Sequence, residues 1–157
     1  MLDSTECPVE RPYDPLIQRI FYSGKSKQHS MKYEIAVGLQ DGDIKWINGG
    51  VPGSVHDLKL ARYGQIKEHL LPHEFILADK AYVGESIFIT PIKGTHTKLE
   101  EAINMVLNTH REVVEHTFCR IKNFHCLSQR WRHNLTLHPI VFQTICNIVN
   151  IDKHIPV

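Results

Sequence analysis

Apolar and polar residues alternate in two early segments of the chain, and this alternation predicts two β-strands. The segments are residues 32–39 and 44–47, and the turn signal Asp41-Gly42 lies between them. An alternating pair joined by such a turn is typical of a β-hairpin. The glycines and the proline within residues 49–53 then predict a break in the sheet.

A further strand is predicted by the unbroken apolar run at residues 75–78, which lies between Pro72 and Gly84. An unbroken run of this length is typical of a buried strand, and a short strand at residues 87–89 would follow it. Asp79 closes the run. Its carboxylate is therefore expected to leave the sheet edge and enter a crevice.

Helical spacing occurs in three regions. Ser54 and Asp57 form a capping-box pattern that predicts a short helix through Tyr63. Apolar residues at three- and four-residue intervals predict a long helix over residues 98–124. Pro139 fits the first turn of a last helix.

The order of these elements narrows the fold class without fixing it. A hairpin, a helix, another strand and then helices on a mixed sheet is the order of the ribonuclease-H-like fold. The pattern alone leaves this as one of several α/β possibilities. The length of 157 residues and the hydrophobic content of 42% fit one domain over residues 1–157, with no internal repeat.

Composition limits the cellular setting and the cofactor. The four cysteines show no paired short spacing, and no apolar run is long enough for a signal peptide or a membrane span. These features predict an intracellular, reduced protein with no membrane partner. A zinc cluster of His116, Cys119, His125 and Cys126 is disfavoured because its spacing matches no common finger.

Three acids stand where the predicted elements would hold them. Asp79 ends a strand, Glu115 flanks the buried stripe of the long helix, and Asp3 follows the Met1-Leu2 start of a possible first strand. Carboxylates brought together from two strands and a helix suit a two-metal phosphoryl-transfer site. Two basic stretches, residues 15–33 and 111–133, would suit a polyanionic substrate, and a pair of solvated faces is the plainer alternative.

Five sequence segments occur in a characteristic order: LDSTECPVERP around Asp3, FYSGKSKQHSMKYEI at 21–35, VPGSVHD at 51–57, FILADKAY at 75–82, and the helix pattern Asn104, Arg111, Val114, Glu115, Phe118, Arg120 and Lys122. In this order they resemble the Harbinger-type members of the DDE transposase superfamily, whose nuclease domain has a ribonuclease-H-like fold. Any one segment is weak. Five in the right order are specific and cover nearly the whole chain.

The resemblance implies a site, a cofactor and a substrate. Its three acids fall on Asp3, Asp79 and Glu115, with Asp3 bridging two ions and each of the others completing one site. Hard oxygen ligands favour Mg²⁺, with Mn²⁺ as a substitute. The implied reactions are hydrolysis of a DNA phosphodiester and strand transfer. The candidate phosphate contacts, which would make DNA binding steeply salt-dependent, are Lys25, Lys27, Lys80, Arg120, Lys122, Arg130 and Arg132.

The start of the chain departs from the family pattern. Members carry a DNA-binding region and several strand residues before the first aspartate, where this chain has only Met1 and Leu2. A truncated first strand would hold Asp3 poorly, and end recognition would need a separate accessory protein. The alternatives are an inactive remnant that binds DNA or protein and a general structure-selective nuclease. A homo-oligomer fits any of these, in the nucleus of a eukaryotic host or otherwise in the cytoplasm.

Several neighbouring residues have structural alternatives. Asp57 is assigned to the helix start in preference to catalysis. Glu112 could share the face of Glu115 or pair with His116, and Arg111 could form an ion pair with Glu115. Tyr82 and Trp131 are expected to pack in the core or at its rim in preference to stacking on bases.

Overall fold

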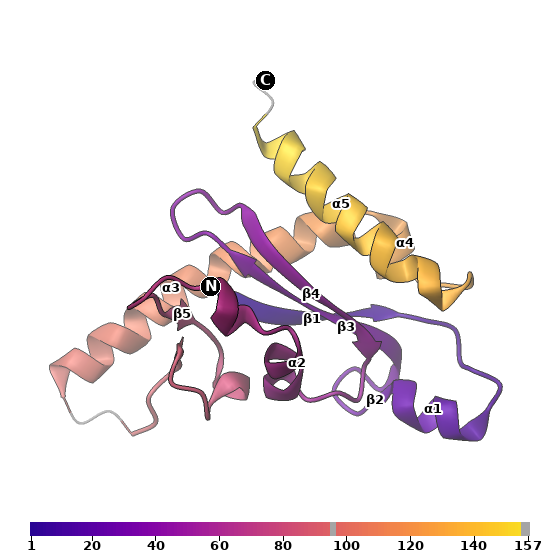
Figure 1. The fold of residues 1–157 in the computed structure, drawn as a ribbon, viewed down its shortest axis with the longest axis horizontal. Helices are drawn as coiled ribbons and strands as arrows, with labels where there is room; N and C mark the ends of the chain where they lie inside the picture. The colour runs from indigo at the N-terminus through magenta and orange to yellow at the C-terminus, as the bar shows by residue number, and fades with distance from the viewer. Residues whose placement is uncertain (95–96, 155–157) are drawn as a thin grey trace.

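A central antiparallel sheet organises the computed structural model, which describes residues 1–94 and 97–154. Strand β1 (Leu2–Pro8) pairs with β3 (Gln28–Val37), and β3 pairs on its other side with β4 (Ile44–Pro52). The short strand β2 (Tyr22–Ser23) joins the beginning of β3. The three long strands are labelled together in the middle of Figure 1.

Two short strands extend this sheet beyond β1. Strand β5 (Ile76–Leu77) runs parallel to β6 (Phe88–Ile89), and a parallel bridge between Leu2 and Ala78 connects the pair to β1. The order across the molecule is therefore β4, β3, β1, β5 and β6. The first three strands are antiparallel, and the last two run parallel to β1.

Helices cover both faces of the sheet. The α-helices are α1 (Pro15–Phe21), α2 (Asp57–Tyr63), α3 (Lys98–Lys122), α4 (His125–Ser128) and α5 (His138–Lys153), and the 3₁₀ turns are η1 (Ile66–His69), η2 (Lys80–Tyr82) and η3 (Leu135–Leu137). Figure 1 shows α3 and α5 on one side of the sheet and α2 on the other. Helices α3 and α5 contact the long strands from one side, and α2 contacts β3 and β4.

Each face of the sheet has its own hydrophobic core. Tyr33 and Ile35 of β3 pack beneath α3 and α5, with Phe142 stacked on Tyr33 at a centroid distance of 3.9 Å. On the other face, Leu2 and Ala78 pack with Tyr82, which is fully buried as predicted. Successive residues of a strand point to opposite faces of the sheet. The core in which one residue lies therefore shows which face its neighbours in the strand point to.

The first strand corrects the prediction of a truncated one. Strand β1 continues from Leu2 through Pro8 and pairs along its whole length with β3, so that Asp3 lies opposite Ile35. The prediction was wrong because it placed the strand before Asp3. Polar residues such as Ser4 and Glu6 obscure the alternation, since their side chains are held in hydrogen bonds on one face of the sheet.

The hairpin is confirmed, and its strands are longer than predicted. Strand β4 continues through Gly49 and Gly50, where the sequence predicted a break. Tyr33 pairs with Gly49 and Lys32 pairs with Val51, so the ladder has a bulge at this point. Both glycines have positive φ angles, +133° and +77°, which allow the strand to pass the bulge without ending.

The helices follow the sequence closely, with one different cap. Helix α2 ends at Tyr63 as predicted, but Ser54 does not cap it, because the Ser54 hydroxyl donates to the carbonyl of Ile20 at 2.6 Å. Asp57 is the first residue of α2, as expected, although its carboxylate has other partners. The long helix and the last helix are both confirmed, and the capping box of the long helix begins at Thr97.

Candidate active site

The strand register brings Asp3 and Asp79 to neighbouring positions. Leu2 and Ala78 form the bridge between β1 and β5, and both are fully buried in the core beneath α2. The next residue on each strand therefore points to the other face, toward α3. Each carboxylate also accepts the backbone N–H that follows it, Asp3 from Ser4 at 2.8 Å and Asp79 from Lys80 at 2.7 Å.

Helix α3 brings the third acid to the same edge through an arginine. Arg111 Nε donates to Glu115 Oε1 at 2.9 Å, one helical turn later, which is the ion pair that the spacing predicted. Its Nη1 lies 3.9 Å from Asp79 Oδ1. The side chains of Asp79 and Glu115 are 33% and 54% exposed, so both carboxylates remain open to solvent.

Asp3 is the most buried of the three acids, and its charge depends on its neighbours. Burial raises the pKa of the Asp3 carboxyl, and the Ser4 amide together with the positive charges of Lys25 and Arg111 opposes that rise. The negative charge of Asp79 adds to it. Asp3 and Asp79 thus lie within the electrostatic influence of Lys25 and Arg111 at this edge.

The donor set suits a hard divalent cation, although the side chains are not gathered around one. Carboxylate oxygens are the ligands that Mg²⁺ and Mn²⁺ prefer. Among residues 1–94 and 97–154, no group of three or more histidine, cysteine, aspartate or glutamate side chains is arranged to hold a metal ion. The same finding leaves the disfavoured zinc cluster of His116, Cys119, His125 and Cys126 without support. Arg111 supplies the positive charge between Asp79 and Glu115.

A small pocket beside β1 is lined by two lysines, of which Lys25 acts on the charge of Asp3. The volume of the pocket is about 290 Å³. Lys122 Nζ donates to the backbone carbonyl of Glu6 at 3.0 Å, which fixes the end of α3 against β1. Lys25 lies in the loop between β2 and β3, as does Lys27, which has a positive φ of 54°. The pocket is lined by Ser4, Thr5, Glu6, Lys25, Ser26, Gln28 and Lys122.

The remaining basic candidates lie in different surroundings. Lys80 follows Asp79 directly and opens η2 on the surface. Arg120 donates to the carbonyl of Val149 at 2.9 Å and to Asp152 at 3.0 Å, so its guanidinium joins α3 to α5.

Arg130 and Arg132 lie at the far end of β1. They flank Trp131, which is buried as expected and forms a bridge with Val9. Val9 lies six positions after Asp3, a span of about 20 Å.

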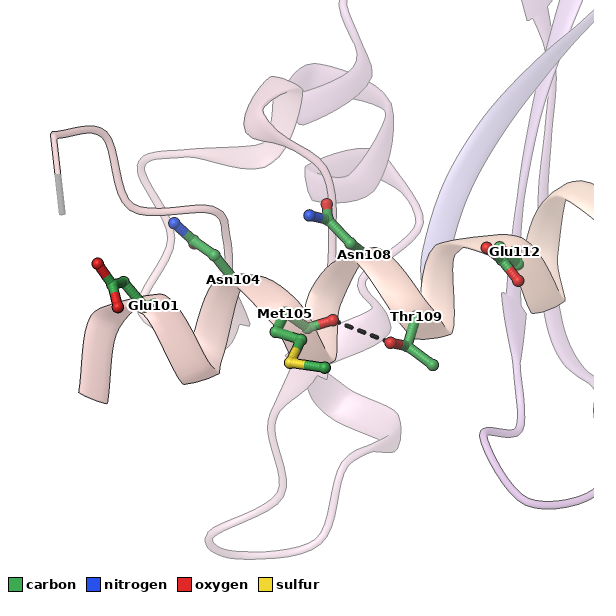
Figure 2. Close-up of a pocket in the computed structure, with 6 residues that line it drawn as sticks. All are labelled: Glu101, Asn104, Met105, Asn108, Thr109 and Glu112. Atoms are coloured by element: carbon green, nitrogen blue, oxygen red, sulfur yellow. Dashed lines mark hydrogen bonds between the residues drawn. The ribbon is translucent and has the colours of Figure 1, made fainter. Parts of the chain in front are cut away.

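A separate groove runs along α3. It is lined by Glu101, Asn104, Met105, Asn108, Thr109 and Glu112. Figure 2 shows these side chains along one helix, with the Thr109 hydroxyl donating to the carbonyl of Met105 at 3.0 Å. Glu112 lines this groove, and no ion pair joins it to His116 in the described part of the chain. The groove contains none of the three acids.

A buried polar network lies behind Asp3 and Asp79, on the opposite face of the sheet. Glu34 and Lys32 are almost completely buried, although alternation with apolar residues is typical of the solvent-facing side of a strand. Asp57 accepts from Lys32 Nζ at 3.0 Å and from the Ser4 hydroxyl at 2.9 Å. Sequence reasoning missed this network, and its only signal was an acid within the VPGSVHD segment.

Glu34 is the centre of a second branch of this network. It accepts from Asn48 Nδ2 at 2.9 Å and from the Tyr82 hydroxyl at 3.3 Å. Burial raises the pKa of Glu34 to about 7, and the negative charge of Asp57 adds to the rise, while both hydrogen bonds and Lys32 oppose it. Burial therefore favours the protonated form of Glu34.

The mixed α/β fold agrees with comparisons with known proteins. The DDE superfamily endonuclease family matches residues 2–151, and the chain belongs to this family. It is 31% identical over 161 aligned positions to the "Probable transposase for insertion sequence element IS702" of Microchaete diplosiphon, an alignment that covers 97% of this chain and 56% of that protein. The chain thus spans little more than half of that relative's length.

Two further findings complete the comparison. No solved structure matches the chain significantly. No helix in the described residues is long and apolar enough to cross a membrane.

Proposed function

We propose that this chain is the catalytic part of a metal-dependent DNA endonuclease of the transposase type, with Asp3, Asp79 and Glu115 as its acids. The observation that carries the proposal is the bridge between Leu2 and Ala78, which makes the two aspartates neighbours. Membership in the DDE superfamily endonuclease family supports it, because that family acts on DNA.

We also propose that the fold is ribonuclease-H-like. The strand order β4, β3, β1, β5, β6 supports this, with three antiparallel strands followed by two that run parallel to the first. The acids then come from the first strand, the end of a neighbouring parallel strand and a helix across that face. The Harbinger-type subgroup remains a prediction within the wider superfamily.

The three carboxylates would hold Mg²⁺ or Mn²⁺, two ions in the proposed mechanism. A bound divalent cation would supply positive charge for the oxygens of the transferring phosphate. The residues of this chain have separate tasks. Asp3 and Asp79 are aligned by their own strands and by the amides they accept, and Glu115 is oriented by Arg111. Arg111 would also lie beside the DNA phosphate, since half of its side chain is exposed.

Basic residues around the acids are the proposed contacts for the phosphates of bound DNA. Lys25, Lys27, Lys80 and Lys122 are the proposed contacts near the reacting phosphate. Arg130 and Arg132, about 20 Å from Asp3, would contact the duplex roughly six base pairs away. We assign Arg120 to the α3–α5 contact, because Val149 and Asp152 already accept its hydrogen bonds.

An accessory DNA-binding protein and a homo-oligomer both fit the proposed function. The similar transposase comes from Microchaete diplosiphon, a bacterium, and this favours a cytoplasmic over a nuclear setting.

Calorimetric titration of Mn²⁺ into the protein tests the proposal. We expect binding by the unsubstituted protein and loss of that binding in Asp79→Asn and Glu115→Gln. Glu85→Gln is the matched control, because Glu85 also pairs with an arginine, Arg62, and its side chain has a similar exposure of 32%. Mn²⁺-dependent nicking of DNA should follow the same pattern.

A folded protein that binds no Mn²⁺ would support a second candidate function, a non-cutting DNA- or protein-binding module. The position of Arg111 between Asp79 and Glu115 is the observation that favours it, because a fixed guanidinium would replace the metal. In that case DNA binding would be unaffected by Asp79→Asn.

A further inference from the structure

Three polar residues form a row across the central sheet, directly behind the proposed acids. Ser4 of β1 pairs with Glu34 of β3, and Glu34 pairs with Asn48 of β4. All three point toward α2 and η2, as their hydrogen bonds to those elements show. Asp3, next to Ser4, points the other way.

Hydrogen bonds connect this row of residues to α2, which covers it. The Ser4 hydroxyl donates to Asp57 at the first turn of α2, and Asn48 Nδ2 donates to the carbonyl of Leu60 at 3.0 Å. Lys32 Nζ donates to Asp57 at 3.0 Å and to the carbonyl of Val55 at 2.6 Å, which holds the segment that leads into α2.

The second branch reaches the turn that carries Asp79. Tyr82 closes the η2 turn that Asp79 begins, and the amide of Tyr82 donates to the carbonyl of Asp79 at 3.0 Å. The Tyr82 hydroxyl donates to Glu34. Asp79 is therefore connected to the middle strand of the sheet through a single fully buried tyrosine.

These connections add to the limited pairing between β1 and β5. In the described residues, β1 and β5 are joined by one isolated bridge, whereas β1 and β3 pair along seven residues. One bridge leaves the relative position of Asp3 and Asp79 poorly restrained. A buried network with satisfied hydrogen bonds is rigid, because each bond is stronger in a low-dielectric interior and each unpaired group would be costly.

Burial of charge also argues for a geometric role. Replacing buried ion pairs by apolar residues of similar volume is often neutral or stabilising, so a buried lysine among acids contributes little to stability by itself. Lys32 and Glu34 occupy strand positions where apolar side chains would pack beneath α2. Glu34 accepts from Tyr82 in the turn that Asp79 begins. Lys32 shares the acceptor Asp57 with Ser4, the residue after Asp3.

We propose that Tyr82 and Asp57 are positioning residues that hold Asp3 and Asp79 in neighbouring positions, from which the two carboxylates would help to capture a divalent cation. Tyr82 acts through Glu34, and Asp57 acts through Ser4 and Lys32. Neither side chain touches the substrate or the reacting atoms. This inference rests on the proposed function of the acids and assigns a role to the acid of the VPGSVHD segment.

Removing one hydroxyl group tests this role with little disturbance of the core. Tyr82→Phe deletes the bond to Glu34 and keeps the aromatic ring. Tyr33→Phe is the matched control, because the Tyr33 hydroxyl is also buried and pairs with His138 Nδ1 at 2.7 Å, beneath α5 and away from the acids. Both variants lose one buried hydrogen bond, so both are expected to lower the thermal midpoint.

Metal capture should separate the two variants. We expect Tyr82→Phe to weaken Mn²⁺ binding about three- to tenfold. The Mn²⁺ concentration for half-maximal nicking should rise by the same factor. At saturating Mn²⁺, the kcat of this variant should stay within about twofold of the value for the unsubstituted protein. Tyr33→Phe should leave both metal values unchanged. Asp57→Asn should weaken binding in the same way as Tyr82→Phe. Equal Mn²⁺ affinity in the unsubstituted protein, Tyr82→Phe and Asp57→Asn would overturn the inference.

A metal-free measurement keeps this test independent of the proposed function. The amides of Ser4 and Lys80 donate to Asp3 and Asp79, so their hydrogen exchange reports how firmly the two acids are held. We expect Tyr82→Phe to accelerate exchange at Lys80 about fivefold or more, with no change in Tyr33→Phe. Unchanged exchange at Lys80 would reject the positioning role. Absence of Mn²⁺ binding by the unsubstituted protein would instead reject the proposed function.

Discussion

Arg111 and Glu115 form an ion pair across one turn of α3, with Nε and Oε1 2.9 Å apart, and the same guanidinium reaches toward Asp79 at 3.9 Å. Arg111 thus supplies the positive charge between two of the three acids. A divalent cation held by these carboxylates would compete with it. Metal affinity and arginine position are therefore coupled in the proposed site.

Substitution of Arg111 tests this competition. We expect Arg111→Ala to bind Mn²⁺ a few times more tightly, because the carboxylates lose their internal cation and the local potential becomes more negative. Stability should change by less than about 1 kcal/mol, since the pair is half exposed. DNA binding should weaken at the same time. Calorimetry with Mn²⁺ and thermal unfolding provide the two measurements.

Arg62 offers a control for the loss of an exposed arginine. It pairs with Glu85 at 2.7 Å, and its exposure is similar to that of Arg111. Arg62→Ala should leave Mn²⁺ affinity unchanged. Weaker Mn²⁺ binding in Arg111→Ala than in the unsubstituted protein would show that the orientation of Glu115 by the arginine outweighs its competition with the ion.

Lys25 provides a test of the DNA path. Its charge acts on Asp3, and no acidic side chain lies within ion-pair distance of it in the described residues. We expect Lys25→Ala to reduce the slope of log K against log salt concentration by about 0.9, because one phosphate contact is lost. Fluorescence anisotropy with a labelled duplex at several salt concentrations measures the slope.

The matched substitution is Lys59→Ala. Lys59 is an exposed lysine of α2 whose ammonium lies 5.6 Å from the ring centroid of Tyr63, on the face of the sheet away from the acids. Its removal changes the net charge equally and should leave the slope unchanged. An equal fall in slope for both variants would mean that general charge, and not a contact at Lys25, controls binding.

The sequence predicted those parts of the site that local patterns determine. An unbroken apolar run ending in Asp79 and a helical stripe beside Glu115 each fixed one acid on one element. The strand containing Asp3 was harder to predict, because Ser4 and Glu6 satisfy their polar groups inside the protein. A polar side chain that is buried with hydrogen-bond partners looks the same in the hydrophobic pattern as one exposed to solvent.

The network around Glu34 could not be predicted for the same reason. Lys32 and Glu34 alternate with apolar residues, and this pattern normally marks a solvated face of a sheet. Here α2 and η2 cover that face, and only tertiary structure supplies the partners Asp57 and Tyr82. The predicted break at Gly49 was wrong because a bulge, like a turn, uses glycine at positive φ.

The bulge itself yields a prediction about stability. A Cβ at Gly49 would lie 2.6 Å from the carbonyl oxygen of Lys32 and 2.6 Å from Tyr33 Cα, and the residue has a φ of +133°. Gly49→Ala should therefore lower the free energy of unfolding by about 2–4 kcal/mol. Urea denaturation measures the change.

Gly24 is the comparison position for that experiment. A Cβ there would meet nothing within 4 Å, so Gly24→Ala should change the free energy of unfolding by no more than about 0.5 kcal/mol. Equal effects of Gly49→Ala and Gly24→Ala on the free energy of unfolding would contradict this prediction. Such a result would mean that the backbone at the bulge can shift freely and is not restrained by the pairing of β3 with β4.

The final prediction concerns the pH dependence of stability. Burial raises the pKa of Glu34 from 4.5 to about 7, so the folded protein keeps this proton over a range where the unfolded chain has released it. The protonated Glu34 carboxyl makes its full contribution to the free energy of unfolding below pH 4.5. That contribution is lost as the pH rises through about 7. A tenfold difference in acid dissociation constant between the folded and unfolded chains corresponds to about 1.4 kcal/mol of stability.

Glu34→Gln isolates this contribution because glutamine does not titrate and still fits between Asn48 and Tyr82. We expect the free energy of unfolding of the unsubstituted protein, minus that of Glu34→Gln, to fall between pH 4.5 and 7 and to level off above pH 7. Asp57 and Lys32 face Glu34 and are present in both proteins, so the difference isolates the contribution of Glu34. A difference that rose with pH would mean that Glu34 is ionised in the folded protein, with Lys32 stabilising its charge more than burial opposes it.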